Sequence, residues 1–100
     1  KAFENSVPIS IFQRDQELVG IGRLVTDGCT FAWLCDVYVD PIHRGNGIGH
    51  LITRAAIDYF GVIPSLKLIL KTDDAHGVYR DCGFSALSKP DAWMAIEYPA

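Results

Sequence analysis

Apolar and polar residues partly alternate over residues 9–14, and two more stretches before position 40 have the composition of strands. Residues 9–14, 17–25 and 31–39 are rich in β-branched and aromatic types, and turn-forming residues separate them. We therefore expect antiparallel hairpins, with residues 31–39 as a long, mostly buried central strand. Two glycines inside the second stretch, Gly20 and Gly22, indicate a bulge or a close backbone approach.

The period changes to that of an α-helix further along the chain. Apolar residues recur three or four positions apart from Ile48 to Tyr59, and polar residues occupy the other positions. Gly61 marks the end of this amphipathic helix. Asp40-Pro41 ends the strand before it, because proline cannot donate to a β-ladder.

The second half of the chain gives signals for four more elements. They are a strand over 66–71, a short helix over 75–82, and two terminal strands over 84–86 and 93–97. A strand–helix–strand unit nearly always crosses right-handed and leaves its two strands parallel. We therefore predict an α/β (α+β) fold with a mixed, mostly antiparallel sheet around one strand–helix–strand unit. Its ligand site should lie between Val39 and Gly49, where the strand ends and the helix begins.

The composition narrows the classes of function. One hundred residues fit a single domain over 1–100, and the apolar runs are far shorter than the roughly 18 residues that span a bilayer. A net charge of -3 with scattered Lys and Arg argues against a nucleic-acid partner. Three cysteines without C-x-x-C spacing predict neither a metal site nor a disulfide framework. Since no basic, apolar leader opens the chain, we expect a cytoplasmic protein.

A glycine-rich loop precedes the predicted helix. Gly45, Gly47 and Gly49 alternate there, and glycine lets a backbone approach a ligand closely. Unpaired N–H groups at a helix start attract anions and Arg44 adds a positive charge, so the loop fits a pyrophosphate. A P-loop and a dinucleotide fingerprint both fail on spacing, because the loop lacks Gly-Lys-Ser/Thr and its third glycine comes one residue early. A glycine-rich turn without a ligand remains the alternative from these residues alone.

Two longer motifs follow one another along the chain. The first, from Asp36 to Gly49, has a strand ending in Val-Asp-Pro and then Arg-x-x-Gly-x-Gly at the helix start. The second, from Ala75 to Phe84, has a helical Tyr79 before Gly-Phe. In sequence, order and spacing they resemble the signature of the GNAT superfamily of N-acetyltransferases. The resemblance covers nearly all of the chain and implies the acyl-CoA N-acyltransferase fold.

The resemblance also implies acetyl-CoA or coenzyme A as cosubstrate, without a metal. Backbone groups at the end of the central strand would meet the pantetheine and the thioester carbonyl, and the loop would hold the pyrophosphate. The residues that match the family's cofactor-binding positions are Val37, Tyr38, Val39, Arg44, Gly45, Asn46, Gly47, Ile48, Gly49 and Tyr79.

Acetyl transfer to an amine needs a neutral amine, donors for the oxyanion and a proton for the thiolate. By resemblance Tyr79 lies beside the cofactor sulfur as the acid. Asp36 is a candidate base or binder of a cationic amine, and equally a hydrogen-bonded structural aspartate. His76 shares a helix face with Tyr79, although a surface or capping role fits it better. His43 and His50 flank the loop, where they would only touch phosphate.

We therefore expect an acetyl-CoA-dependent N-acetyltransferase that moves the acetyl group to a primary amine of a small molecule or peptide by direct attack. The alternative is a module that binds CoA or acyl-CoA without turnover, for example as a sensor. A nucleotide-binding domain conflicts with the loop spacing.

Two departures from the family change the expectations. Thr72 stands where family members often have an asparagine that contacts the cofactor. The chain begins at Lys1, just before the family's second strand, so either the usual front strand and helices are not included in this sequence or this is a minimal version of the fold. A sheet face or edge would then be exposed, and a homodimer, with strands exchanged, would cover it. Trp33 and Trp93 are expected to fill the core.

Overall fold

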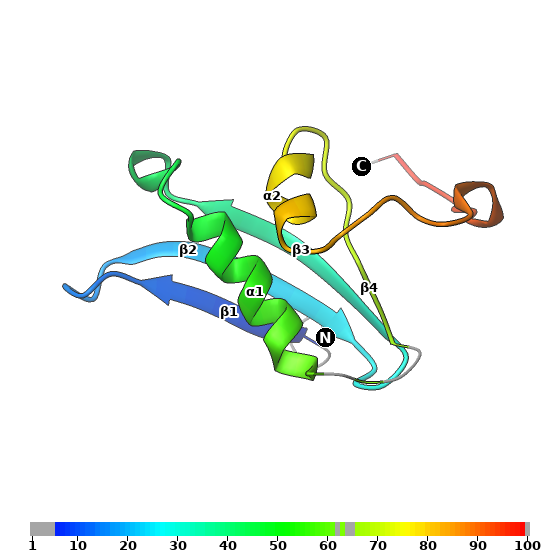
Figure 1. Cartoon of the computed structure of the whole chain (residues 1–100), viewed down its shortest axis with the longest axis horizontal. Helices are drawn as coiled ribbons and strands as arrows, with labels where there is room; N and C mark the ends of the chain where they lie inside the picture. The colour runs from blue at the N-terminus through cyan, green and yellow to red at the C-terminus, as the bar shows by residue number, and fades with distance from the viewer. Residues whose placement is uncertain (1–5, 62, 64–65, 100) are drawn as a thin grey trace.

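The computed structural model describes residues 6–61, 63 and 66–99. Within them, four strands form one sheet in the order β1-β2-β3-β4 (Figure 1). The strands are β1 Ser6–Phe12, β2 Leu18–Thr26, β3 Phe31–Val39 and β4 Lys67–Ile69. The pairs β1–β2 and β2–β3 are antiparallel, and β3–β4 is parallel. The predicted mixed, mostly antiparallel sheet around a strand–helix–strand unit is therefore confirmed.

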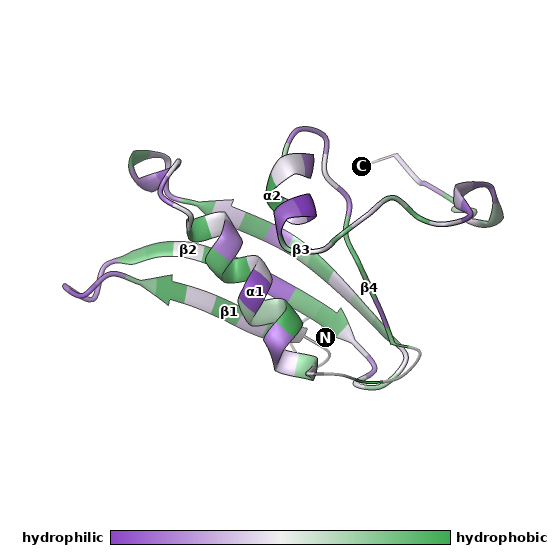
Figure 2. Ribbon diagram, viewed as in Figure 1, coloured by the Kyte–Doolittle hydropathy of each residue, from purple (hydrophilic) through white to green (hydrophobic). Residues whose placement is uncertain are grey.

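The helix of that unit, α1 Ile48–Phe60, lies across one face of the sheet. Its apolar stripe buries Ile52 and Ala56 against a core that contains Leu24 and Leu34. Figure 2 shows apolar positions alternating with polar ones along the strands beneath it. The helix ends at Gly61, whose φ of 61° lies in the left-handed region. The predicted amphipathic helix is therefore present with the expected end.

Two glycines of β2 let α1 approach the sheet closely. A Cβ added at Gly20 would lie 2.6 Å from Ile48 Cγ2, and one at Gly22 would lie 2.8 Å from Ile52 Cγ2. Both separations are shorter than van der Waals contact, so side chains there would push the helix away. The close approach expected from these glycines is confirmed.

The opposite face of the sheet carries apolar side chains that stay in contact with solvent. Ile21, Trp33 and Tyr38 alternate with the buried positions and keep 39%, 43% and 52% of their surface exposed. The prediction of a mostly buried central strand was therefore wrong, because α1 covers only one face of β3. For the same reason Trp33 does not fill the core, and Trp93 is 44% exposed as well.

A β-bulge interrupts the pairing of β2 with β3. Arg23 pairs with Cys35 and Ile21 pairs with Tyr38, so two β3 residues face Gly22 alone. One of these two is Asp36, which takes a φ of 55°. The left-handed region is tolerated by aspartate better than by most residues, which suits it to a bulge.

The observed boundaries of some elements differ from the predicted ones. The first strand is Ser6–Phe12 rather than 9–14, because the turn closes early: Gln13 N donates to Glu17 O at 2.8 Å. Short helices occupy Pro41–His43, His76–Asp81 and Pro90–Ala92, which Figure 1 labels where there is room, the second as α2. No described helix is long and apolar enough to cross a bilayer.

The two predicted terminal strands, 84–86 and 93–97, were wrong. Both segments are described, yet neither pairs with another strand. A strand needs a partner for its backbone groups, and β4 makes its ladder with β3 alone within the described residues. Met94, Ile96 and Tyr98 consequently lie 81–95% exposed.

Candidate active site

An opening between β3 and β4 defines the candidate site. Their parallel pairing runs from Phe31–Lys67 to Trp33–Ile69 and stops there, while β3 continues to Val39. In Figure 1, β3 and the segment that follows β4 diverge beyond this point. The backbone of residues 34–39 therefore has no β4 partner on that side, so its N–H and C=O groups can meet a ligand.

The predicted cofactor residues of β3 lie along this opening. Val37 and Val39 pack their side chains toward the α1 side of the sheet, whereas Tyr38 is on the exposed face. Tyr38 is paired with Ile21 of β2, so the backbone groups of Val37 and Val39, rather than any side chain, face the opening. The expectation that backbone groups meet the cofactor there stays a prediction.

The glycine-rich loop follows β3 directly and leads into α1. Gly45 has a φ of 84° and Gly47 a φ of 81°, which residues with a side chain rarely adopt. Nothing lies within 4 Å of a Cβ added at either position, so the space beside them is open to a ligand. Gly49 differs, since its added Cβ would lie 3.6 Å from Val78 Cγ1 of α2 and its φ is not positive.

The loop presents a row of unpaired backbone donors. The first bond of α1 runs from Leu51 N to Gly47 O at 3.1 Å. Among the described residues, the N–H groups of residues 45–50 have no acceptor within the protein. Together with the positive end of the helix dipole, these groups could hold an anion such as a pyrophosphate.

Arg44 is held at the entrance to this loop. Its Nε donates to Val39 O at 3.1 Å, and its guanidinium carbon lies 5.7 Å from the centre of the Tyr38 ring. Arg44 is an exposed residue, so its remaining guanidinium nitrogens could bind a phosphate oxygen. Asn46 stabilises the loop, because its Nδ2 donates to His43 O at 3.2 Å.

Tyr79 lies on α2, which packs beside α1 on the same side of the sheet. Its ring is half-buried and meets Phe84 edge-on, with ring centres 5.9 Å apart. Burial raises the pKa of the Tyr79 hydroxyl, and the negative charge of Asp74 raises this pKa further. The phenol therefore keeps its proton at neutral pH.

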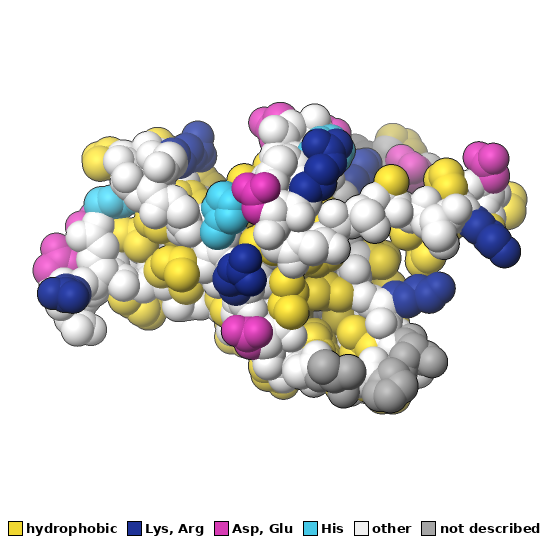
Figure 3. All heavy atoms as spheres, in the orientation of Figure 1, with side chains coloured by type: hydrophobic (Ala, Val, Ile, Leu, Met, Phe, Trp, Pro, Cys, Tyr) yellow, Lys and Arg dark blue, Asp and Glu magenta, His cyan; other side chains and the backbone are white. Residues whose placement is uncertain are grey.

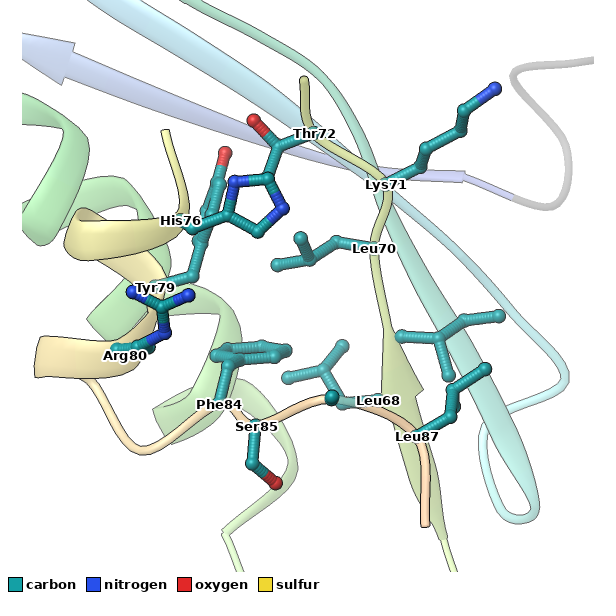
Figure 4. A pocket seen from close by; sticks show the side chains of 12 residues that line it. Leu68, Leu70, Lys71, Thr72, His76, Tyr79, Arg80, Phe84, Ser85 and Leu87 are labelled. Carbon is teal, nitrogen blue, oxygen red and sulfur yellow. The ribbon is translucent and has the colours of Figure 1, made fainter. Parts of the chain in front are cut away.

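A cavity of about 380 Å³ lies between Tyr79 and β4. Figure 4 shows the Tyr79 hydroxyl at one end, with the side chains of Thr72 and His76. The walls further in are apolar and include Leu68 and Leu70. The predicted helical pair His76 and Tyr79 does line one cavity, with His76 on its exposed rim.

Asp36 lies apart from Tyr79. Its carboxylate is 3.0 Å from the Arg23 guanidinium, and its side chain is 65% exposed on the face of the sheet that α1 does not cover. Tyr79 packs on the α1 face. The two predicted catalytic residues therefore lie on opposite faces of the sheet.

The histidines beside the loop have protein partners. His50 Nε2 lies 3.1 Å from Asp81 Oδ2 and joins α1 to α2. His43 lies near Glu17 and Asp40, and the ligand atoms of these three residues lie within 4.8 Å of one another. Both groupings escaped sequence reasoning, because their members come from separate segments with no shared motif.

Comparison with known proteins identifies the protein family. The sequence profile of the acetyltransferase (GNAT) domain matches residues 7–86. A candidate acetyltransferase of Gibberella zeae is 39% identical over 82 residues, which cover 80% of this chain and 46% of that protein. The chain therefore spans less than half the length of this relative.

Solved structures agree with this relationship. A candidate GNAT-family acetyltransferase from Xanthomonas campestris superposes with a TM-score of 0.84 at 33% identity, over 98% of this chain and 68% of that one. A GNAT-family acetyltransferase from Streptococcus pneumoniae gives 0.77 at 28% identity, over 98% and 75%. The chain belongs to the GNAT acetyltransferase family, whose cosubstrates are acyl-CoA thioesters and whose acceptors are amines.

Proposed function

We propose that this chain is an acetyl-CoA-dependent N-acetyltransferase that moves the acetyl group from the thioester to a primary amine by direct attack. The observation that carries the proposal is the row of unpaired N–H groups over residues 45–50, set at the end of β3 beside its opening toward β4. The pyrophosphate of acetyl-CoA would bind these groups and Arg44. The pantetheine would then follow the β3 backbone at Val37, Tyr38 and Val39 into the opening, where Val39 O already accepts from Arg44 Nε.

Each proposed role follows from the chemistry of transfer. The amine nitrogen attacks the thioester carbonyl carbon, and the C–S bond breaks as the amide forms. Backbone N–H groups along β3 would stabilise the oxyanion. Tyr79 would give its proton to the departing thiolate, since its raised pKa keeps the phenol protonated. The proton that the amine loses would pass to Asp36 or to water.

A second function is a module that binds CoA or acyl-CoA without turnover. One observation favours it: the Asp36 carboxylate is paired with Arg23 and lies on the other side of the sheet from Tyr79. A base and an acid are therefore not side by side within the described residues. In this reading the loop would bind the pyrophosphate in the same way, and no acetyl group would move.

Release of free thiol from acetyl-CoA separates the two functions. The purified chain is incubated with acetyl-CoA and a panel of small amines, polyamines, lysine peptides and peptide N-termini. Thiol release above the amine-free background, with acetylated product seen by mass spectrometry, supports the enzyme. Calorimetric CoA binding without release for any amine supports the module. Absence of CoA binding contradicts both.

A further inference from the structure

The cavity beside Tyr79 has room for a small molecule. Its volume is about 380 Å³, within the range of about 300–1,000 Å³ that is usual for small-molecule sites in proteins. The Tyr79 hydroxyl is at one end, and Leu87 lies at the end away from it (Figure 4). A molecule that reacts beside this hydroxyl could therefore extend along the cavity.

The side walls of the cavity are apolar. Leu68, Leu70, Phe84 and Leu87 line it between β4 and the segment that follows α2. In Figure 3, hydrophobic side chains show at the surface in the area where Figure 1 places β4, and no acidic side chain shows among them. Apolar walls stabilise an apolar ligand because they remove its surface from water, whereas a sugar would lose hydrogen bonds there.

The charged residues of the lining are all basic. Lys71 and Arg80 line the cavity, and no aspartate or glutamate does. Neither cation forms an ion pair with another described residue, so its charge is not neutralised. Asp74 acts on the Tyr79 hydroxyl, but it is not part of the lining. A second ammonium group on a ligand would find no carboxylate here, so a polyamine fits this cavity poorly.

The polar end of the cavity suits one amine nitrogen. Neither the Tyr79 hydroxyl nor the His76 ring makes a hydrogen bond to another described residue, so both are available to the nitrogen. Apolar surroundings favour a neutral amine over its ammonium form. The neutral form is the one that attacks a thioester, and Asp36 lies on the opposite face of the sheet.

We propose that this cavity binds the acceptor, and that the acceptor is a monoamine with an apolar body, such as an alkylamine or an arylalkylamine. The inference rests on the proposed function, which puts the thioester sulfur beside the Tyr79 hydroxyl. The attacked carbon is bonded to that sulfur, so the group attached to the amine must also lie near this hydroxyl. The cavity is the apolar space that adjoins it within the described residues.

A series of amines tests the apolar body. Thiol release from acetyl-CoA is measured for the whole chain with ethylamine, butylamine, hexylamine and hexamethylenediamine. Each methylene group that enters an apolar cavity should raise kcat/KM by about fourfold, so hexylamine should exceed ethylamine at least tenfold. The diamine is the matched control, because it adds only a second amino group to hexylamine. Its kcat/KM should be at least tenfold below that of hexylamine.

Substitutions at Leu87 test where the apolar body lies. Leu87→Trp fills the end of the cavity away from Tyr79, so kcat/KM should fall at least tenfold for hexylamine and little for ethylamine. Leu87→Asp adds the carboxylate that the lining lacks, so the diamine should become a better acceptor than hexylamine. Leu18→Trp is the control, because Leu18 is exposed at the start of β2 and does not line the cavity.

Thermal unfolding checks that the three variants fold. In folded Leu87→Trp, an equal loss for ethylamine and hexylamine, or no loss for either, contradicts the placement of the body. A diamine that stays as poor an acceptor in Leu87→Asp as in the unchanged chain contradicts it as well.

The remaining outcomes separate this inference from the proposed function. Thiol release that does not rise from ethylamine to hexylamine, or that is highest with the diamine, overturns the apolar acceptor and leaves the N-acetyltransferase in place. With ethylamine as acceptor, a rate that rises from acetyl-CoA to hexanoyl-CoA shows that the cavity holds the acyl chain, which also overturns the inference. CoA binding without thiol release for any amine removes the proposed function and this inference together.

Discussion

His50 Nε2 lies 3.1 Å from Asp81 Oδ2, so a side chain in the first turn of α1 is tied to α2 two residues after Tyr79. Beside this link, the absence of a side chain at Gly49 lets Val78 approach α1. The glycine-rich loop and the helix of Tyr79 are therefore positioned by the same contacts.

The first prediction concerns this contact between helices. Gly49→Leu should push α2 away from α1, because the added Cβ already lies 3.6 Å from Val78 Cγ1. We expect turnover to fall at least tenfold, with lower thermal stability. Gly49→Ala is the matched control and should change either property little, since 3.6 Å is ordinary contact. Steady-state kinetics and thermal unfolding measure both, and equal effects of alanine and leucine would contradict the packing role.

Tyr79→Phe should affect turnover more than binding. The change removes only the hydroxyl and keeps the ring against Phe84. Loss of a general acid typically lowers the rate by about 10²–10⁴-fold, whereas a lost structural hydrogen bond costs about 0.5–1.5 kcal/mol of stability. We expect kcat to fall while CoA affinity, measured by calorimetry, stays the same. An unchanged kcat would show that Tyr79 is not the acid and only packs against its neighbours. Water or the amine would then supply the proton.

A third prediction tests Asp36 as the base. Asp36→Asn should lower kcat by about 10²-fold or more if the carboxylate accepts the proton. Arg23→Gln is the control, because it removes the ion pair and leaves the carboxylate in place. If Asp36 only pairs with Arg23, both variants should lose at most about 1 kcal/mol of stability and keep their turnover, as exposed ion pairs contribute little. The comparison needs kinetics and urea unfolding of both variants.

The pH dependence of stability should contain a contribution from Asp27. Its carboxylate accepts the Thr30 hydroxyl and the N–H groups of Cys29, Thr30 and Phe31, and these bonds lower the pKa of Asp27 far below its ordinary value. The folded state thus favours the charged form. This stability is present above the unfolded pKa of about 3.9 and is lost as the pH falls toward the folded pKa. Asp27→Asn should show a smaller drop in urea midpoint between pH 7 and pH 3 than the unchanged chain, and an equal drop would contradict the assignment.

Sequence patterns predicted the parts of the fold that depend on local periodicity. The amphipathic helix, its end at Gly61 and the close approach at Gly20 and Gly22 all follow from spacing along the chain. The position of the glycine-rich loop at the end of β3 followed in the same way. The motif that resembles the GNAT signature was likewise local, and the comparisons confirm the family.

Features that depend on partners far along the chain could not be predicted. Residues 93–97 have the composition of a strand, yet whether they form one depends on an available edge rather than on their own sequence. Trp33 is exposed because only one face of the sheet is covered. The bulge at Asp36 and the pairing of His50 with Asp81 arise from register and helix packing, for which single positions give no signal.

Calorimetric titration with CoA tests the central claim, that the loop from Arg44 to Gly49 binds the pyrophosphate. Gly47→Val places a side chain in the open space beside the unpaired N–H groups. Gly28→Val is the matched control, because Gly28 has a similar φ, 85° against 81°, and equally open surroundings, but lies in the turn between β2 and β3. Backbone strain should therefore be alike in both variants. The account predicts that Gly47→Val weakens CoA at least tenfold, about 1.4 kcal/mol, while Gly28→Val keeps the affinity of the unchanged chain. Equal affinity in both folded variants would contradict the assignment of the loop.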